Sequence, residues 1–171
     1  MLLRTPTATK LRDRKIWYHG DVSLLDLPLN GLLCSKACPG GKILEAIDLA
    51  QQWRSENRPV INGFHTAVEK ECLRIFLRGP QPIVICPARG IAPFQLPSDW
   101  QTKYDRDELL IISPFDSAIR RPTKETAEIR NKLVVDLATN VTIIHATRGG
   151  LLHRLATTQT AGIADNRLLA N

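Results

Sequence analysis

The chain has 171 residues, and its 23 lysines and arginines outnumber 17 aspartates and glutamates, which gives a net charge of +6. This length suits one domain with a core large enough to fold alone. Hydrophobic residues make up 43% of the sequence, but no apolar run approaches the length of a membrane-spanning helix, which excludes an integral membrane protein. The modest positive charge favours anionic partners such as nucleotides or nucleic acid, although many enzymes carry as much.

Residues 1–15 are rich in cations and poor in apolar partners. We expect a basic amino-terminal arm over residues 1–15, mobile or on the surface, followed by a single domain over residues 16–171. A contact with a phosphate backbone and a solvated basic tail are both open for this arm. Because the segment lacks a continuous apolar core and a small-residue cleavage site, it does not resemble a signal peptide, and we expect a cytoplasmic location.

Short apolar runs alternate with amphipathic helical patterns along the rest of the chain. Strands are predicted at 16–21, 31–34, 59–63, 82–86, 109–113 and 141–144, with a short last one at 167–169. Helices are predicted at 42–55, 67–78, part of 100–108, 128–138 and after residue 151, whereas 116–126 is predicted to be a loop. The crossovers are long enough for parallel pairing. The fold class is therefore α/β, a Rossmann-like, doubly wound and mainly parallel sheet of at least five strands with helices on both faces.

The run 141–144 is β-branched throughout, as is typical of a strand covered on both faces, so we place it with 32–34 at the centre of the sheet. Residues 147–150 then fall where the carboxyl edge of the sheet meets a helix, the place where ligands bind in open α/β folds. Gly149 and Gly150 leave room for backbone N–H groups to meet a phosphate. A simple turn is the alternative explanation of this glycine pair.

Four segments are predicted to converge at this carboxyl edge and to bind an anion, because three of them follow strands and the fourth opens a crossover helix. The candidate phosphate-binding residues are Ser35, Lys36, Asn62, Gly63, Arg130, Asn131, Lys132, Arg148, Gly149 and Gly150. Two alternatives stay open at this point: a solvated Lys36 in an exposed loop, and an Arg130 that pairs with Glu128 or Asp136. Phe64 is the best-placed aromatic residue for stacking on a base.

The cysteines are Cys34, Cys38, Cys72 and Cys86. They form no C-x-x-C pair, and the four histidines do not cluster with them, so neither a disulfide nor a zinc site is predicted. Buried thiols are the expected state of the cysteines in apolar stretches. We predict no metal and no cofactor.

An ordered series of short motifs resembles a known family. The series contains Trp17 to Leu25 (WYHGDVSLL), the run LLCSK at 32–36, VING at 60–63 followed by TAVE at 66–69, Ile112 with Ser113, Arg130-Asn131-Lys132, and Gly149-Gly150-Leu151. In this order and spacing the chain resembles the Rossmann-like core of the DNA-processing protein A (DprA/Smf) family over roughly residues 16–160. The resemblance implies single-stranded DNA binding and, for the best-known members, loading of the RecA recombinase. It also adds Thr66 to the candidate site, where the family has an arginine.

The sequence departs from the family pattern at several motif positions. The family's glycine, arginine, second glycine, aspartate and histidine are replaced by Cys34, Thr66, Ala67, Glu69 and Leu73. The resemblance therefore implies the fold more strongly than the activity. A recombinase and a second copy of the chain are left open as protein partners.

Two classes of function follow. The first is a DprA/Smf-like module that binds single-stranded DNA or a nucleotide phosphate, with a role in DNA processing or uptake. The alternative is a nucleotide-acting enzyme of the phosphoribohydrolase-like (lysine-decarboxylase-like) group, whose Pro-Gly-Gly-x-Gly-Thr-x-x-Glu motif is echoed only in fragments by Pro39-Gly40-Gly41 and Gly149-Gly150. Glu69 is interpreted as a helix-surface carboxylate, and no Ser-His-Asp or Cys-His arrangement is legible. A binding protein without catalytic residues is favoured over an enzyme, and a scaffold without a ligand is a third possibility.

Overall fold

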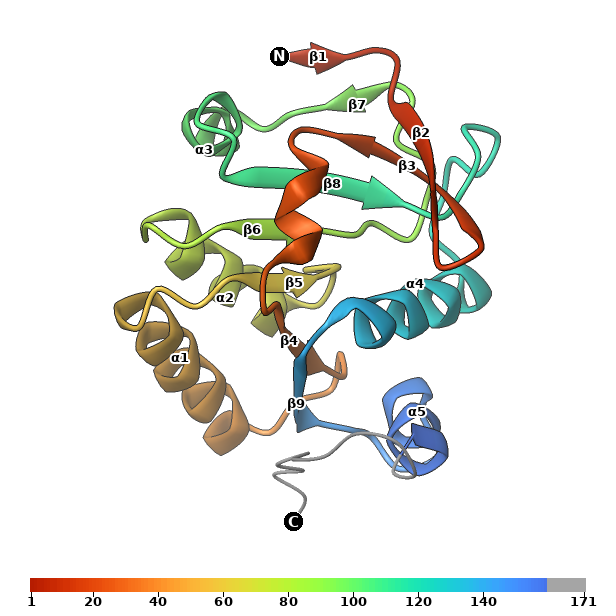
Figure 1. Cartoon of the computed structure of the whole chain (residues 1–171). Helices are drawn as coiled ribbons and strands as arrows, with labels where there is room; N and C mark the ends of the chain where they lie inside the picture. Colours follow the sequence, from red (N-terminus) through yellow and green to blue (C-terminus); the bar gives the residue numbers. More distant parts are fainter. Residues whose placement is uncertain (160–171) are drawn as a thin grey trace.

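A seven-stranded sheet forms the centre of the computed structural model, which describes residues 1–159 (Figure 1). The strand order is β2-β3-β8-β6-β5-β4-β9. The strands are β2 (Thr7–Leu11), β3 (Arg14–His19), β4 (Asn30–Cys34), β5 (Val60–Asn62), β6 (Ile83–Ile85), β8 (Leu109–Ser113) and β9 (Asn140–His145). The last five pair in parallel, and β2 and β3 are antiparallel additions at one side. The predicted fold class, α/β with a mainly parallel sheet, is confirmed.

Helices cover both faces of this sheet, as predicted. One core cluster joins the sheet to α1 (Gly40–Ser55), α2 (Ala67–Leu77), η2 (Ser98–Trp100) and α3 (Gln101–Asp105); the other joins it to η1 (Val22–Asp26), α4 (Lys124–Leu137) and α5 (Leu151–Gln159). Along β8, Leu109 and Ile111 belong to the first cluster, and Leu110 and Ile112 to the second. All four are fully buried, since a parallel strand between two helical layers has no solvent-facing side.

The strand β9 lies at an edge of the sheet, not at its centre. It pairs only with β4 among the described strands, and β4 is itself next to this edge, so the central placement predicted for 32–34 and 141–144 is wrong. The apolar sequence has another cause, because helices cover this edge strand too. Val141 and Ile144 are buried in opposite core clusters, one on each side of the sheet.

Residues 1–15 form strands of two sheets instead of an arm. The segment β1 (Leu2–Leu3) pairs with β7 (Phe94–Gln95), and β2 forms a hairpin with β3 at the sheet edge opposite to β9. The sequence signal was weak because β2 is an edge strand whose residues are all exposed or only partly buried. Arg12 bonds the carbonyl of Asp136 and Arg14 lies 3.9 Å from the Asp136 carboxylate, so the hairpin contacts α4.

The helix α4 begins at Lys124, within the stretch predicted to be a loop. Thr123 and Thr126 cap it reciprocally, each side chain accepting the other residue's backbone N–H. Threonine at the third helical position is not the usual glutamate or glutamine, which explains why the start was missed. Arg130 consequently lies in the second turn of α4 and not in the first.

The carboxyl ends of the five parallel strands meet at one edge of the sheet, called here the carboxyl edge. The loops that leave it, at 35–39, 63–66, 86–93, 114–123 and 146–150, contain one acid and five cations: Asp116 against Lys36, Arg89, Arg120, Arg121 and Arg148. The helices α1, α2 and α4 begin there, and their amino termini add partial positive charge. Charge and topology therefore both point to this edge as the place to look for an anion site.

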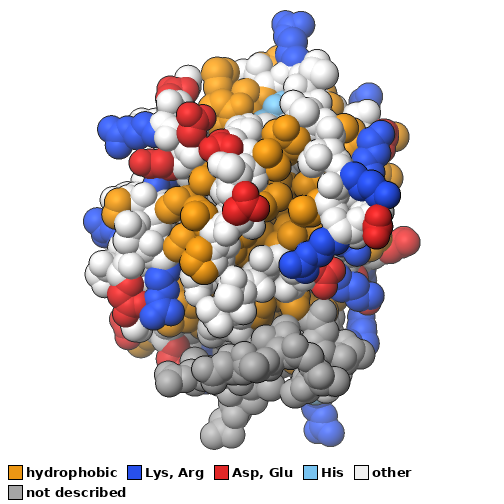
Figure 2. All heavy atoms as spheres, viewed as in Figure 1, with side chains coloured by type: hydrophobic (Ala, Val, Ile, Leu, Met, Phe, Trp, Pro, Cys, Tyr) orange, Lys and Arg blue, Asp and Glu red, His pale blue; other side chains and the backbone are white. Residues whose placement is uncertain are grey.

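On the face that carries η1 and α4, hydrophobic side chains are visible between the charged groups (Figure 2). The partly buried residues that pack against this side of the core include Tyr18, Leu25, Leu27 and Leu137. All four cysteines are free thiols. No helix within residues 1–159 is both long and apolar enough to cross a membrane. The strand predicted at 167–169 lies outside the described residues.

Candidate anion-binding site at the carboxyl edge

Arg130 is the central residue of the candidate site. Its side chain leans from α4 toward the carboxyl ends of β5 and β6, as helix side chains lean toward the amino terminus. One guanidinium nitrogen, Nη1, donates to the carbonyl of Cys86 at 3.3 Å, and Nε donates to the Asn131 side chain at 2.7 Å. Arg130 is only 4% exposed. No carboxylate within residues 1–159 lies in ion-pair distance of it, so both pairings proposed for it, with Glu128 and with Asp136, are wrong.

A buried cation without a counter-ion is uncommon, because removing a charge from water costs several kcal/mol unless a partner compensates it. The donors of the guanidinium other than Nε and Nη1 bond no group among the described residues. Arg130 thus presents a fixed positive charge and spare N–H groups at the carboxyl edge. This arrangement suits an incoming phosphate or carboxylate, which can accept two hydrogen bonds from one guanidinium.

Gly63 makes room for Arg130. A Cβ atom at position 63 would sit 1.0 Å from Nη1 of Arg130, so only glycine lets the guanidinium pack on this turn. The backbone N–H of Gly63 donates to the Asn62 side chain at 2.6 Å, and Asn62 in turn donates to the carbonyl of Leu32. Asn62 and Gly63 therefore shape the site, but the backbone N–H of Gly63, which is its hydrogen-bond donor, is already bonded.

Glu69 holds the neighbouring loop together. Its carboxylate accepts backbone N–H groups from Cys34 at 3.0 Å, His65 at 2.9 Å and Thr66 at 3.2 Å, and it is 3% exposed. Thr66 caps α2 through a reciprocal bond with Glu69. The interpretation of Glu69 as a surface carboxylate is wrong. The capping motif Thr-x-x-Glu was a sequence signal for its role that the interpretation did not use. A carboxylate that accepts three backbone N–H groups fixes the conformation of the loop and is not free to act as a general base.

His65 reports the charges around the site. The pKa of His65 is lowered, first by partial burial and then by the positive charges of Arg130 and Lys36, with a smaller contribution from Lys70 and an opposing one from Glu69. Three cations from different segments thus act on one imidazole at the carboxyl edge. His65 stays neutral near pH 7 and becomes an additional cation only in acid. Sequence reasoning missed both His65 and Lys70, because neither lies in a recognised motif.

The loops after β4 and β9 lie side by side. The backbone N–H of Ser35 donates to the His145 carbonyl at 2.9 Å, and the N–H of Thr147 donates to the Ser35 hydroxyl at 3.1 Å. Ser35 is thereby a structural link, while Lys36 beside it is exposed. Arg148, in the β9 loop, is exposed as well. Lys36 and Arg148 therefore extend the positive charge from Arg130 toward β9.

Four other predicted site residues have structural contacts or conformations of their own. Lys132 lies on the solvent side of α4 and pairs with Glu128 at 3.2 Å. Gly149 has a positive φ of 71° that favours glycine, and the N–H of Gly150 donates to the Thr147 carbonyl at 2.8 Å. The glycine pair accordingly forms a turn, the simpler of the two explanations. Asn131 is buried and orients Arg130.

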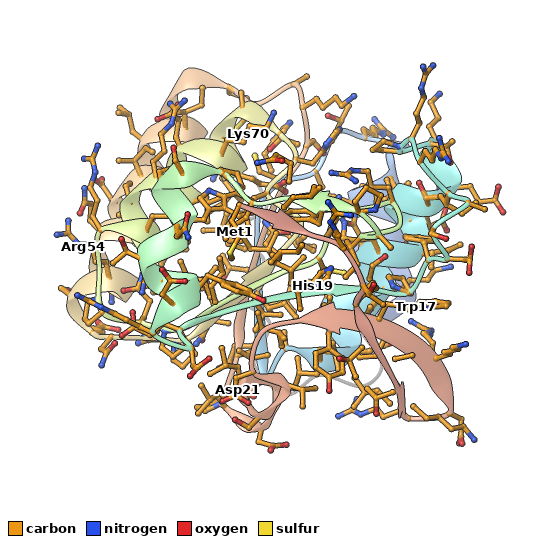
Figure 3. The ribbon with its side chains drawn as sticks, turned by 90° about the horizontal axis from the view of Figure 1, so that it is seen from above. Met1, Trp17, His19, Asp21, Arg54 and Lys70 are labelled. Atoms are coloured by element: carbon orange, nitrogen blue, oxygen red, sulfur yellow. The ribbon has the colours of Figure 1, made fainter. Side chains whose placement is uncertain are left out.

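Phe64 is not available for base stacking. Its ring is 5% exposed and packs edge-on against Phe76, with ring centroids 6.3 Å apart. The aromatic residue that does reach the carboxyl edge is Trp17 of β3, which pairs with Ser113 at the end of β8. Its side chain is partly exposed, and Figure 3 shows it at the end of the molecule opposite to Arg54, which lies in the last turn of α1.

Comparison with known structures supports this reading of the fold. DNA processing protein A (DprA) from Streptococcus pneumoniae aligns with a TM-score of 0.68 and 17% identity, over 87% of this chain and 53% of that one. DprA from Helicobacter pylori, a protein described as binding single-stranded DNA, aligns with a TM-score of 0.61 and 19% identity, over 82% of this chain and 69% of that one. The chain has a DprA-type Rossmann-like fold. The resemblance stated from the motifs is thus confirmed at the level of the fold.

The chain spans about half the length of the S. pneumoniae protein that it matches. The Moco carrier protein from Chlamydomonas reinhardtii aligns less well, with a TM-score of 0.47 and 12% identity over 82% of this chain and 90% of that one. No protein-family model and no curated protein matches the sequence. What the DprA-type fold does in this chain has therefore to be argued from its own residues.

Proposed function

We propose that this protein binds single-stranded DNA through its phosphates, with Arg130 as the principal contact at the carboxyl edge of the sheet. The observation that carries the proposal is the buried guanidinium, 4% exposed and without a carboxylate partner among residues 1–159. Lys36 and Arg148 supply further positive charge on the neighbouring loops. The description of H. pylori DprA as a single-stranded DNA-binding protein of the same fold supports the choice of ligand.

The arrangement of the cations favours single-stranded DNA over an isolated nucleotide as the ligand, because the cations are spread along the carboxyl edge. They follow β4, β6, β8 and β9, and neighbouring strands lie about 4.8 Å apart, so the row is longer than one phosphate group. A single strand places one charge at every nucleotide and can contact several of these cations at once. The role we infer is DNA processing by binding, without catalysis, in which a recombinase or a second copy of the chain is a natural partner of the bound strand.

The test is equilibrium binding of a fluorescein-labelled thymidine oligonucleotide, followed by fluorescence anisotropy, with thymidine monophosphate as competitor. Arg130→Met keeps the volume and removes the charge, and we expect it to weaken binding about 10- to 100-fold, the range for a charge-assisted hydrogen bond. Lys36→Ala should weaken binding less, because Lys36 is exposed.

Lys132→Met is the matched control. It removes a cation from the same helix, two residues away, whose charge is already paired with Glu128 on the solvent side. Its affinity should equal that of the wild type within about twofold. If thymidine monophosphate displaces the oligonucleotide at equal phosphate concentration, the site is built for a nucleotide and the single-strand proposal fails. Equal affinities for wild type, Arg130→Met and Lys132→Met would also reject it.

A further inference from the structure

A small slot opens at the carboxyl edge beside the cations. Its walls are Trp17 of β3, residues 91–92 in the loop after β6, and Phe115 with Ser117 in the loop after β8; residues 5–6 complete it. The cavity volume is about 160 Å³. Its position follows from the register, since Trp17 lies opposite Ser113, the last residue of β8. Nothing in the phosphate site described above uses this slot.

The walls of the slot are fixed to one another by buried hydrogen bonds. Nε2 of His19 lies 2.9 Å from the carbonyl of Ile91, which ties β3 to the first loop. The Ser113 hydroxyl donates to the carbonyl of Arg89 at 2.7 Å and accepts the N–H of Phe115 at 3.1 Å, which ties the two loops together. Because the slot is preformed, a ligand does not have to order it on binding.

The slot is flanked by positive charge. The ammonium group of Lys15 lies 5.0 Å from the centroid of the Trp17 ring. Arg89, on the loop that forms one wall, places its guanidinium 5.5 Å from the centroid of the Phe94 ring of β7. A purely apolar ligand would gain nothing from these cations. A flat aromatic ligand that is covalently attached to phosphates would use both the slot and the charges.

We propose that this slot holds one unstacked base of the single strand whose phosphates contact Arg130, a proposal that rests on the function proposed above. Arg130 lies over the ends of β5 and β6, and Trp17 lies on β3, two strands from β6. Along the sheet that offset corresponds to about 10 Å, which a DNA single strand spans with about three stacked nucleotides. The volume is below the ~300 Å³ at which pockets hold whole small ligands, so the slot suits one ring system.

The experiment compares two labelled oligonucleotides of equal length, one of thymidines and one abasic, in which every phosphate is kept and every base is missing. Trp17→Ala should weaken binding of the thymidine oligonucleotide about 10-fold and leave the abasic one unchanged, since only base stacking is lost. Trp17→Phe should recover most of the affinity. Tyr18→Ala is the matched control, because Tyr18 is the neighbouring aromatic residue on β3 and packs against the opposite core cluster.

The outcomes separate this inference from the proposed function. If Arg130→Met weakens both oligonucleotides while Trp17→Ala weakens neither, or weakens both equally, the slot does not hold a base and only this inference is overturned. If the wild type binds neither oligonucleotide, both proposals are overturned. Circular dichroism checks each variant. Should Trp17→Ala not fold, Trp17→Leu takes its place: it keeps an apolar side chain but removes the flat ring, and it should weaken binding of the thymidine oligonucleotide alone.

Discussion

The carboxyl edge and the amino edge of the sheet differ in the charged residues that their loops contain. The loops at the carboxyl edge contain five cations and one acid, whereas the loops at the amino edge, at 20–29, 56–59, 78–82, 106–108 and 138–139, contain three cations and five acids. Each edge also buries one cation. Lys103 at the amino edge donates to the Gln81 carbonyl at 2.8 Å and to the Glu108 carboxylate at 3.2 Å, while Arg130 at the carboxyl edge has no acidic partner among the described residues.

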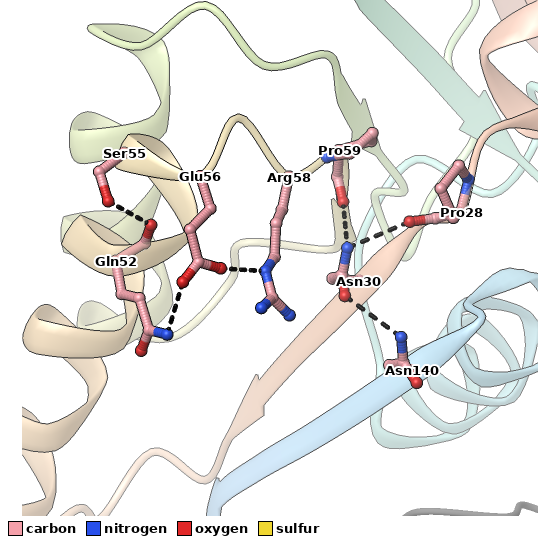
Figure 4. A network of polar contacts seen from close by, with 8 residues as sticks. All are labelled: Pro28, Asn30, Gln52, Ser55, Glu56, Arg58, Pro59 and Asn140. Atoms are coloured by element: carbon pink, nitrogen blue, oxygen red, sulfur yellow. Dashed lines mark hydrogen bonds and ion pairs between the residues drawn. The ribbon is translucent and has the colours of Figure 1, made fainter.

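Several side chains of the amino edge hydrogen-bond one another, although Oε1 of Gln81 is buried without a partner among the described residues. Figure 4 shows Asn30, whose amide donates to the carbonyls of Pro28 at 3.1 Å and Pro59 at 3.0 Å, and whose side-chain oxygen faces Asn140. In the same view Glu56 accepts from both Gln52 and Arg58. Such a network stabilises the fold and pairs the acid Glu56 with the cation Arg58. The comparison shows that a buried cation alone does not indicate a binding site; the candidate site is indicated by a buried cation that has no acidic partner among the described residues.

The largest expected effect concerns the one buried carboxylate at the carboxyl edge. Glu69→Ala leaves three backbone N–H groups without their acceptor and should lower the free energy of unfolding by about 2–4 kcal/mol. Urea denaturation measures this loss. A variant as stable as the wild type that binds the oligonucleotide more tightly would contradict the comparison, because Glu69 would then be a counter-ion of the site.

Gly63→Ala tests whether the position of Arg130 matters as much as its charge. The added Cβ would overlap the guanidinium, so Arg130 must move, and oligonucleotide affinity should fall about 10- to 100-fold, as in Arg130→Met. The double variant Gly63→Ala/Arg130→Met should bind the oligonucleotide no more weakly than either single variant, since both substitutions remove the same contact. Gly41→Ala is the control, because its Cβ would meet nothing within 4 Å. Additive losses would show that Gly63 acts by a separate route.

The two buried cations can be exchanged for methionine and compared directly. Lys103→Met should lower the free energy of unfolding by about 1–2 kcal/mol, through loss of its bonds to Gln81 and Glu108, and leave DNA binding unchanged. Arg130→Met should not lower the free energy of unfolding, because it removes the desolvation cost of an unpaired buried charge, and it should weaken DNA binding. Thermal unfolding and fluorescence anisotropy measure the two effects. A loss of DNA binding in Lys103→Met together with a loss of stability alone in Arg130→Met would contradict the account.

The smallest effect is a pH dependence that originates at His65. Its pKa is lowered in the free protein by burial and by Arg130 and Lys36, and a bound phosphate would offset those charges and raise it. Affinity should therefore rise a few-fold as the pH falls from about 7 to about 5. The free energy of unfolding should change in the opposite sense. Between the ordinary histidine pKa of about 6.5 and the lowered pKa of the folded state, the unfolded chain binds more protons than the folded one. The contribution of His65 to stability is therefore fully present above this pH window and is lost as the pH falls through it. His65→Gln should remove both dependences.

The sequence predicted the layered fold well, because that fold depends on local patterns. Buried runs such as 109–113 are apolar throughout and are separated by helices of crossover length, which is enough to infer parallel pairing. It could not place 141–144 within the sheet, because an edge strand covered by helices has the composition of a central one. The segment 1–15 was missed for the opposite reason, since β2 buries too little to show a pattern.

The candidate site was predicted in part. Arg130 and Gly63 were both named, but their contact joins residues far apart in the sequence, and only the structure shows that one makes room for the other. The role of Glu69 was readable from the capping motif with Thr66 and was overlooked. The slot at Trp17 was not predictable, because it depends on the register of an antiparallel strand beside a parallel sheet.

The central claim is that Arg130 is a phosphate contact and not a structural cation. The most direct measurement is the dependence of oligonucleotide affinity on salt concentration for the wild type, Arg130→Met and Lys132→Met. Each phosphate contact contributes about 0.7 to the slope of log K against log salt for a single strand. The account predicts that Arg130→Met reduces the magnitude of the slope by about 0.7 and that Lys132→Met leaves it unchanged. Identical slopes for all three proteins, or a reduction only in Lys132→Met, would contradict it.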